Sequence, residues 1–255
     1  MSSLKSIAII PARFESTRFP GKALVTIANK TMIQHVYERS LQAKSVVEVV
    51  VATDDVRILR AVQAFGGQAR MTSPLHRSGT DRVAEVAALT DADVVVNVQG
   101  DEPLIDPEAL DAVVAPFHSD PSLMISTLSV DGMEGELENP NVVKVVVDQD
   151  NFALYFSRSP IPFFRDASPM AGKQRFSKHV GLYGYRRDFL MRLESLKDSY
   201  LEKAEELEQL RFLDNGYRIK VVNTRYQSLA VDTPEDLERV NAFIKERAWQ
   251  TSSSL

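Results

Sequence analysis

The sequence predicts an α/β fold in which helices cover both sides of a mostly parallel central sheet, with a smaller mixed or antiparallel excursion. Two observations predict it. In the first half of the chain, short apolar and β-branched segments alternate with amphipathic segments of helical period. In the second half, four strand-like segments follow one another with few helices between them. Because no Gly/Ser-rich linker and no internal repeat divides the chain, we expect one domain over residues 1–250.

The first half begins with a strand over 7–10, which ends at Pro11. A helix follows an N-cap at Thr31 and places Ile33, Val36, Tyr37, Ser40 and Leu41 on one face. Residues 46–52 are nearly all apolar, as in a strand that is buried on both faces. The alternation continues with a helix over 56–65 that ends at Gly66-Gly67, a helix over 81–89, a strand over 94–98 and a helix over 107–117.

The second half supplies the mixed part of the sheet. Its strand candidates are 124–130, 142–147, 152–157 and 180–185, with the excursion around 148–164. A helix is expected over 201–213, and a last helix begins with the N-cap pattern Thr233-Pro234. Residues 251–255 are expected to be a disordered tail.

Composition narrows the class of protein. The 255 residues contain 30 Lys and Arg against 35 Asp and Glu, a net charge of −5, and no cysteine. The missing thiols exclude disulfides, thiolate zinc sites, iron–sulfur clusters and cysteine nucleophiles. Mild acidity argues against a nucleic-acid or polybasic membrane partner. The sequence has neither a membrane-length apolar segment nor a signal peptide, so we expect a cytoplasmic protein.

The loop after the first strand, residues 11–22, is the first candidate binding segment. Arg13, Arg18 and Lys22, with the Ser16 hydroxyl, could surround a polyphosphate. The segment is neither a P-loop nor a Gly-x-Gly-x-x-Gly fingerprint. A solvated basic loop is the alternative interpretation.

The loop after the third strand contains Gln99, Gly100 and Asp101. An acid directly after a buried strand is typical of a Mg²⁺ site that carries nucleotide phosphates. The alternative is an ordinary turn. Asp232 precedes the Thr233 cap and could be a second metal ligand or part of the capping turn.

The turn over 77–82 offers small residues around Gly79, which would let a planar ligand approach the backbone, or else simply caps the next helix through Thr80 or Asp81. Among the histidines, His179 is best placed to touch a polar ligand, His76 is ambiguous, and His35 and His118 are expected to be surface or packing residues. No metal-binding histidine spacing and no Gly-x-Ser-x-Gly elbow occurs.

Taken together, these segments resemble the 3-deoxy-manno-octulosonate cytidylyltransferase (CMP-Kdo synthetase) family. The resemblance extends from about residue 7 to residue 243. The segments that carry it are 10–13, 16–22, 51–55, 78–82, 97–103, 153–158, 179–186, 207–211 and 231–237.

The resemblance implies a nucleotide-diphosphosugar-transferase-like (Rossmann-like) three-layer fold and a homodimer. It implies an enzyme that transfers CMP from CTP to the anomeric hydroxyl of 3-deoxy-D-manno-octulosonate (Kdo), releases pyrophosphate, and forms CMP-Kdo for lipopolysaccharide biosynthesis. The implied nucleotide-binding residues are Ala12, Arg13, Ser16, Arg18, Lys22, Arg77, Ser78, Gly79, Arg82 and Gln99. The implied Mg²⁺ ligands are Asp101 and Asp232, which with Lys22, Arg13 and Arg18 would form the catalytic set. The implied sugar-binding residues are Arg158, His179, Tyr183, Glu208 and Gln209.

Some residues depart from the family pattern, and some alternatives stay open. Glu15 places an acid in the phosphate loop, and Phe19 and Ala23 stand where leucine and proline are familiar. The alternative substrates are 8-amino-Kdo and N-acetylneuraminate, of which the 181–186 and 207–211 segments disfavour the latter. A non-catalytic nucleotide-sugar-binding protein would not need both Asp101 and Asp232.

Overall fold

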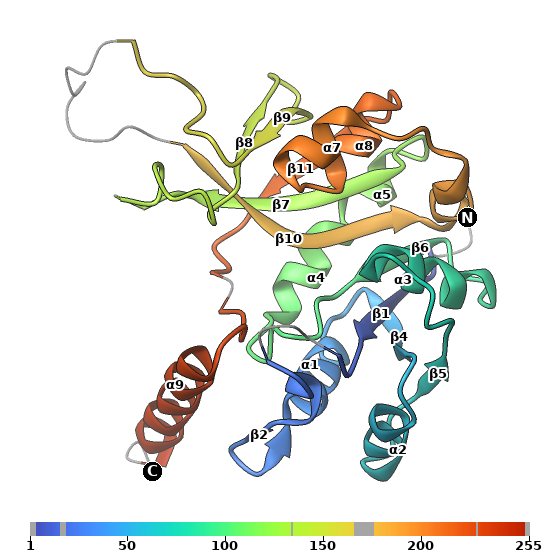
Figure 1. Ribbon diagram of the computed structural model, residues 1–255, viewed down its shortest axis with the longest axis vertical. Helices are drawn as coiled ribbons and strands as arrows, with labels where there is room; N and C mark the ends of the chain where they lie inside the picture. The colour runs from blue at the N-terminus through green and yellow to red at the C-terminus, as the bar shows by residue number, and fades with distance from the viewer. Residues whose placement is uncertain (1–3, 16–18, 134, 166–175, 228, 253–255) are drawn as a thin grey trace. The chain divides into compact units, whose positions relative to one another are not determined.

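Strand β1 (Ser6–Ala12) lies inside a group of four parallel strands. The computed structural model describes residues 4–15, 19–133, 135–165, 176–227 and 229–252. Strand β1 pairs with β4 (Val46–Thr53) on one side and with β6 (Val94–Asn97) on the other, and β4 pairs with β5 (Ala69–Met71) (Figure 1). Ile7 to Ile10 are all fully buried. Because successive side chains of a strand point to opposite faces, both faces of β1 are covered. Burial on both faces was predicted for 46–52, and it holds for Val49 to Ala52 of β4.

The helices of this part follow the predicted alternation. Helix α1 (Met32–Ser40) packs on β1 and β4, α2 (Val56–Ala64) on β4 and β5, and α3 (Gly79–Ala88) on β1, β4 and β6. The predicted apolar face of α1 is buried except for Leu41, which follows the helix and is half-exposed. A short hairpin of β2 (Thr26–Ile27) and β3 (Lys30–Thr31) precedes α1.

Contacts group the chain into two units, Met1–Asp111 with Ser228–Leu255, and Ala112–Gln227. The prediction of one domain over 1–250 stays a prediction.

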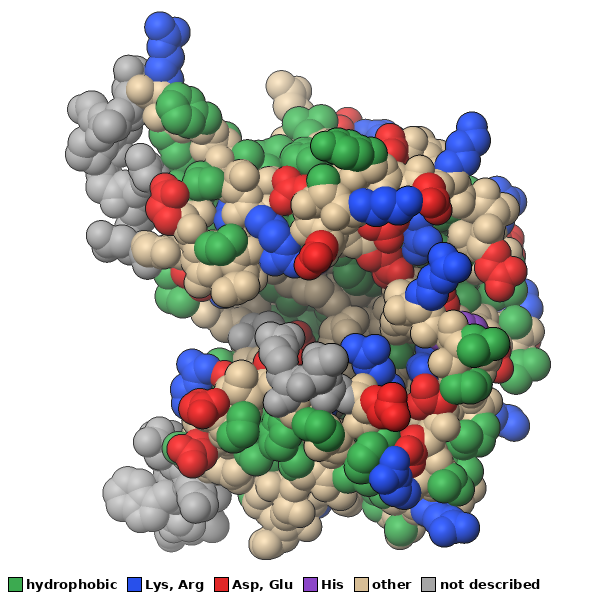
Figure 2. Space-filling view, in the orientation of Figure 1, with side chains coloured by type: hydrophobic (Ala, Val, Ile, Leu, Met, Phe, Trp, Pro, Cys, Tyr) green, Lys and Arg blue, Asp and Glu red, His purple; other side chains and the backbone are tan. Residues whose placement is uncertain are grey.

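Figure 2 shows Lys and Arg side chains interspersed with Asp and Glu over the visible face. In the part of the chain that the structure describes, no helix combines the length and the apolar content needed to cross a bilayer.

The second unit contains the mixed strands. Strand β7 (Ile125–Asp131) pairs antiparallel with β10 (Ser177–Arg186) and parallel with β11 (Ile219–Asn223). Strand β8 (Lys144–Val147) pairs antiparallel with β10 and with β9 (Ala153–Ser157). Helix α6 (Arg187–Leu190) follows β10 directly. Parallel pairing in the first unit and mostly antiparallel pairing here confirm the predicted fold class.

Two predicted helices are each divided in the structure. The helix expected over 107–117 is α4 (Pro107–Val114) and α5 (Pro116–Ser119), because Pro116 has no N–H to continue the hydrogen-bond ladder. The helix expected over 201–213 is α7 (Tyr200–Glu205) and α8 (Gln209–Asp214). The break lies at Glu206, whose φ of 51° is left-handed.

Four strands were not predicted, the short hairpin strands β2 and β3 and the strands β5 and β11, and the last helix is longer than expected. The edge strand β5 has only three residues, one of them charged, so its pattern is weak. Strand β11 alternates buried Ile219 and Val221 with half-buried residues, a period-two signal that the sequence does carry. Helix α9 (Pro234–Ser252) continues two residues into the segment expected to be a disordered tail, and 253–255 lie outside the described residues.

Candidate active site

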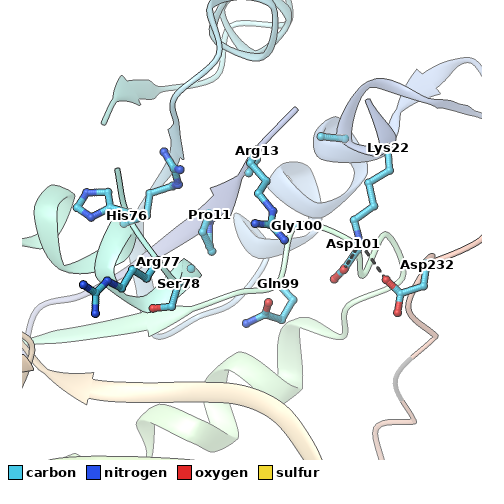
Figure 3. Close-up of a pocket in the computed structure, with 14 residues that line it drawn as sticks. Pro11, Arg13, Lys22, His76, Arg77, Ser78, Gln99, Gly100, Asp101 and Asp232 are labelled. Atoms are coloured by element: carbon cyan, nitrogen blue, oxygen red, sulfur yellow. Dashed lines mark hydrogen bonds and ion pairs between the residues drawn. The ribbon is translucent and has the colours of Figure 1, made fainter. Parts of the chain in front are cut away.

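The carboxyl ends of β1 and β6 and the start of α3 border a pocket of about 430 Å³ (Figure 3). Parallel α/β sheets bind ligands at this edge of their strands. The residues that line the pocket are Pro11, Ala12, Arg13, Lys22, Ala23, His76, Arg77, Ser78, Gly79, Arg82, Gln99, Gly100, Asp101 and Asp232. Every described residue of the predicted nucleotide-binding and metal sets is among them. Ser16 and Arg18 lie outside the described residues.

The loop after β1 closes on itself and brings Lys22 to the pocket. The Gly21 N–H donates to the Phe14 carbonyl at 2.8 Å. Gly21 has a left-handed φ of 71°, and a Cβ there would lie 3.1 Å from the Phe14 ring. Glycine satisfies both conditions. The chain then enters a 3₁₀ turn, Lys22–Leu24, so that Lys22 and the exposed Arg13 line one pocket from the two ends of the loop.

The three departures from the family pattern have separate explanations. Glu15 is exposed and does not line the pocket; its charge acts on Arg57 instead. Phe19 packs against the apolar cluster around Ile27. Ala23 is buried at the pocket wall. Glu15 therefore does not offset the positive charge that Arg13 and Lys22 bring to the pocket.

The segment after β6 crosses the end of β1 at very short range. A Cβ on Gly100 would lie 2.9 Å from the Pro11 carbonyl oxygen, closer than a real side chain can approach a backbone atom. Only glycine allows this crossing without a shift of the backbone. The crossing places Gln99 and Asp101, the residues on either side of Gly100, at the pocket wall.

The turn before α3 forms a capping box. The Ser78 hydroxyl accepts from the Asp81 N–H at 3.1 Å, and the Asp81 carboxylate accepts from the Ser78 N–H at 3.2 Å. Ser78 is therefore the N-cap, where the sequence suggested Thr80 or Asp81. Gly79 packs against Pro11, with its would-be Cβ 3.3 Å from the Pro11 ring. The turn thus both caps the helix and presents backbone to the pocket.

Arg82 lines the pocket but is already engaged. Its side chain is 5% exposed, and Nη2 donates to the Asp54 carboxylate at 2.6 Å. Nη1 donates to the Thr72 hydroxyl. These bonds fix α3 to the segments that follow β4 and β5. Any contact of Arg82 with a nucleotide would come in addition to this structural role.

Lys22, Asp101 and Asp232 form a three-residue charge cluster. The Lys22 Nζ lies 2.6 Å from Asp101 Oδ2 and 3.0 Å from Asp232 Oδ1 (Figure 3). Burial alone would lower the pKa of the ammonium, but the two carboxylates outweigh burial and raise the pKa of Lys22 above its ordinary value. The lysine is therefore fully charged at neutral pH.

The segment that carries Asp232 is held by contacts that do not use its carboxylate. The Val231 N–H donates to the Asp101 carbonyl at 2.8 Å, and Val231 is fully buried in the cluster around Ile27. The Asp236 carboxylate accepts from the N–H groups of Asp232 and Thr233, at 3.0 and 2.9 Å. Thr233 and Asp236 thus form a capping box at the start of α9 through bonds that do not include the Asp232 carboxylate.

The donor set of this cluster fits a hard cation. Mg²⁺ is usually held by one or two carboxylates, while substrate phosphates and waters complete its octahedral shell. Asp101 and Asp232 supply two carboxylates on either side of one shared cation, the Lys22 ammonium. Among the described residues, no group of three or more His, Cys, Asp or Glu side chains is arranged around a common point. Asp101 and Asp232 are the two carboxylates that line this pocket among the described residues.

The predicted sugar-binding residues all lie in the second unit, where His179 and Tyr183 are neighbours. Their ring centroids are 5.4 Å apart, and a register shift of β10 separates the two residues. Burial lowers the pKa of His179 to about 3, so the imidazole is neutral. Burial, and then the charge of Glu208, raise the pKa of Tyr183, which stays a protonated phenol.

We assign the proton of the neutral His179 ring to Nε2 from the hydrogen bonds of Thr127. The Thr127 hydroxyl lies 2.9 Å from the Leu182 carbonyl, to which it donates, and 3.0 Å from His179 Nε2. A hydroxyl has one proton, so it accepts from the Nε2–H of the neutral ring. His179 Nδ1 is then an acceptor, which suits a sugar hydroxyl and does not suit a carboxylate.

The remaining sugar-set residues have mixed placements. Arg158 uses three N–H groups of its guanidinium on the carbonyls of Glu205, Pro140 and Glu206, at 2.7, 3.0 and 3.4 Å. It therefore ties loops together. Glu208 pairs with Arg211 at 3.3 Å, and Gln209 is 5% exposed with an Nε2 that has no hydrogen-bond partner among the described residues.

Four pocket residues were not in the predicted sets: Pro11, Ala23, His76 and Gly100. Pro11 and Gly100 belong to motifs that the sequence analysis quoted, and their contribution is the backbone crossing. His76 was left ambiguous; its ring bonds to Glu85, which also accepts from the Ser73 N–H at 2.9 Å. The pairing with Glu85 spans nine positions and has no sequence signature of its own.

Comparison with known proteins gives one consistent result. The family model described as Cytidylyltransferase matches residues 7–220. The 3-deoxy-manno-octulosonate cytidylyltransferase of Geotalea daltonii is 56% identical over 253 residues, which cover 96% of this chain and 100% of that protein. The protein of the same name from Geobacter sulfurreducens is 56% identical over 246 residues, 93% of this chain and 98% of that protein.

Solved structures agree. The structure of CMP:2-keto-3-deoxy-manno-octonic acid synthetase complexed with CTP is 48% identical and superposes with a TM-score of 0.91, covering 95% of this chain and 99% of that one. A cytidylyltransferase from Leptospira borgpetersenii, at 18% identity and a TM-score of 0.63, shares the fold. The mostly parallel α/β fold, the family match and the near-full-length identity lead to one conclusion: this chain belongs to the 3-deoxy-manno-octulosonate cytidylyltransferase family.

Proposed function

We propose that this protein transfers CMP from CTP to the anomeric hydroxyl of Kdo and releases pyrophosphate, as the names of its relatives indicate. The observation that carries the proposal is the pocket at the carboxyl ends of β1 and β6. Its lining combines four cationic side chains, those of Arg13, Lys22, Arg77 and Arg82, with the carboxylate pair Asp101 and Asp232. An excess of cations around a small carboxylate pair suits a triphosphate that carries a metal ion.

The chemistry asks the protein mainly for positioning and charge stabilisation. A hydroxyl attacks the α-phosphorus in line with the departing pyrophosphate, and negative charge spreads over the phosphate oxygens. Arg13 lies near the start of the loop after β1 and Lys22 lies near its end, and both side chains would bind phosphate oxygens. The backbone at half-buried Ser78 and exposed Gly79 would receive the nucleoside, and Gln99 would offer amide hydrogen bonds to it.

Asp101 and Asp232 would hold Mg²⁺, which supplies charge neutralisation at the reacting phosphate when it is bound. For the sugar, His179 Nδ1 would accept from a hydroxyl, and the Tyr183 phenol and the Gln209 amide would add neutral hydrogen-bonding groups. The engagement of Arg158 with three carbonyls supports a role in shaping loops rather than in binding the sugar carboxylate.

A pyrophosphate-release screen tests the function. The four nucleoside triphosphates are each paired with Kdo, 8-amino-Kdo and N-acetylneuraminate, with and without Mg²⁺. We expect turnover with CTP and Kdo that depends on Mg²⁺. Turnover with N-acetylneuraminate but not with Kdo would make N-acetylneuraminate the sugar substrate in place of Kdo. Nucleotide binding without any turnover would favour a non-catalytic binding protein. We also propose, because of the family resemblance, that the protein is a homodimer and that it is located in the cytoplasm.

A further inference from the structure

The Lys22 ammonium lies between two carboxylates from distant parts of the chain. Asp101 is 79 positions away and Asp232 is 210 positions away, yet both carboxylates contact the same Nζ, at 2.6 and 3.0 Å. The three side chains are only 20%, 24% and 38% exposed. Charges that are partly withdrawn from water interact more strongly than surface charges, so the lysine is an effective counter-cation for the pair.

The same two carboxylates are the proposed metal ligands, and two cations cannot share them at full strength. Mg²⁺ needs carboxylate oxygens at about 2.0–2.1 Å in a near-octahedral shell. An ammonium that donates to one oxygen of each carboxylate removes those lone pairs from a metal and repels the metal ion as well. With Lys22 in place, the cluster carries a net charge of only −1.

A nucleoside triphosphate offers the lysine a second partner within the same pocket. Lys22 lines the pocket together with Arg13 and the backbone at Ser78, where phosphates and nucleoside are proposed to bind. We propose that Lys22 has a guard role: without nucleotide, its ammonium occupies the Asp101–Asp232 pair and weakens the binding of a metal ion alone. When a metal–triphosphate complex binds, Lys22 moves to phosphate oxygens. The inference rests on the proposed function, since it assigns metal and nucleotide to this pocket.

Metal binding without nucleotide tests the inference directly. The probe is Mn²⁺, with free Mn²⁺ followed by electron paramagnetic resonance on the full-length chain. We expect weak binding to the wild-type protein and binding about tenfold tighter or more to Lys22→Gln, because a unit positive charge near a divalent ion is removed. Lys22→Arg keeps the charge and should bind as weakly as the wild type. Lys30→Gln removes a lysine that pairs with Glu38 and should also match the wild type.

Two further measurements secure the assignment. Asp101→Asn added to Lys22→Gln should abolish the tight site, which places it at the carboxylate pair. On the wild-type protein, Mg²⁺ at high concentration should increase acylation of Lys22 by an amine-reactive ester, measured by peptide mass spectrometry with Lys30 as the internal reference. This second experiment needs no variant that might fail to fold.

Equal Mn²⁺ affinities of the wild-type and Lys22→Gln proteins would overturn the proposal, and so would tight binding by Lys22→Arg. Neither experiment contains sugar or nucleotide. A protein that fails to turn over CTP and Kdo but shows the predicted Mn²⁺ pattern would contradict the proposed function and leave the guard role intact. The reverse combination would contradict only the guard role.

Discussion

At the scale of single residues, the charge cluster of Lys22, Asp101 and Asp232 has the clearest chemical consequence. Each carboxylate contacts the same ammonium, at 2.6 and 3.0 Å, and the capping box at the start of α9 is formed by Thr233 and Asp236. A charge pair that serves only the fold could be replaced with small cost. A pair that holds a metal-bound phosphate cannot.

We predict that Asp101→Asn and Asp232→Asn each lower kcat by roughly 100- to 1000-fold, because each removes a charge next to the reacting phosphate. The loss is measured by pyrophosphate release at saturating CTP and Kdo. Asp91→Asn is the matched control, since Asp91 pairs with Lys5 on the surface, outside the pocket. A near-normal rate in either variant would remove that residue from the catalytic set.

Arg82 is predicted to act first through the fold. Arg82→Ala should lower the free energy of unfolding by about 2–4 kcal/mol, because it leaves Asp54 without its buried partner. Asp54→Ala should cost a similar amount, and the double variant much less than the sum of the two. Urea unfolding of the four proteins measures this coupling. Additive losses would show that the Arg82–Asp54 pair contributes nothing to stability.

At the scale of elements, the start of α9 positions a site residue. The Asp236 carboxylate accepts from the N–H groups of Asp232 and Thr233, and the Asp236 N–H lies 3.3 Å from the Thr233 hydroxyl. This capping box fixes the backbone immediately before the helix. Val231 packs in the apolar cluster around Ile27 and completes the anchor. The orientation of Asp232 therefore depends on a residue that lies outside the pocket lining.

We predict that Asp236→Ala raises the Mg²⁺ concentration for half-maximal rate by about tenfold, because the support of a metal ligand is lost. The same change should lower the free energy of unfolding by about 1–2 kcal/mol. Rates over a Mg²⁺ titration and urea unfolding measure the two effects. Glu238→Ala, on the exposed side of α9, is the control. An unchanged Mg²⁺ dependence would limit Asp236 to stability.

At the scale of the whole molecule, the neutral His179 links stability to pH. Its folded-state pKa of about 3 lies below the ordinary value of 6.5, so the unfolded chain takes up the proton first as the pH falls. The contribution is complete above pH 6.5 and is lost progressively as the pH falls from 6.5 towards 3.

The free energy of unfolding should therefore fall by up to about 1.4 kcal/mol per pH unit below pH 6.5 on account of this group. Urea unfolding at pH 7.5, 6.5 and 5.5 measures the slope, which His179→Gln should reduce and His118→Gln, at an exposed position, should not. Equal slopes in the wild-type and His179→Gln proteins would mean that the imidazole titrates normally in the fold.

The proposed homodimer is tested on the whole molecule. Sedimentation equilibrium at micromolar concentration should give twice the chain mass of 28.5 kDa. A mass of one chain across the concentration range of the assay would contradict the prediction and make the monomer the active form.

Much of the fold was predictable, because its strongest signals are local. Consecutive apolar residues such as Ile7 to Ile10 predict a strand, and β1 is one. Local signals also explain one of the two divided helices, since Pro116 marks the end of α4. The break at Glu206 has no such marker, because an acid in the left-handed region is held there by its surroundings and not by its own preference.

The pocket was predictable as a set of segments, since residues that follow parallel strands meet at one edge of the sheet. The sequence by itself determined the α/β class, the loop after β1, the Asp101 loop and the cap before α9. Only the tertiary structure decided how their charges are shared. It placed Lys22 between Asp101 and Asp232, and it gave Arg82 to Asp54 and Arg158 to backbone carbonyls. Ion pairs between distant positions depend on where the folded backbone brings side chains together, and no local pattern specifies that.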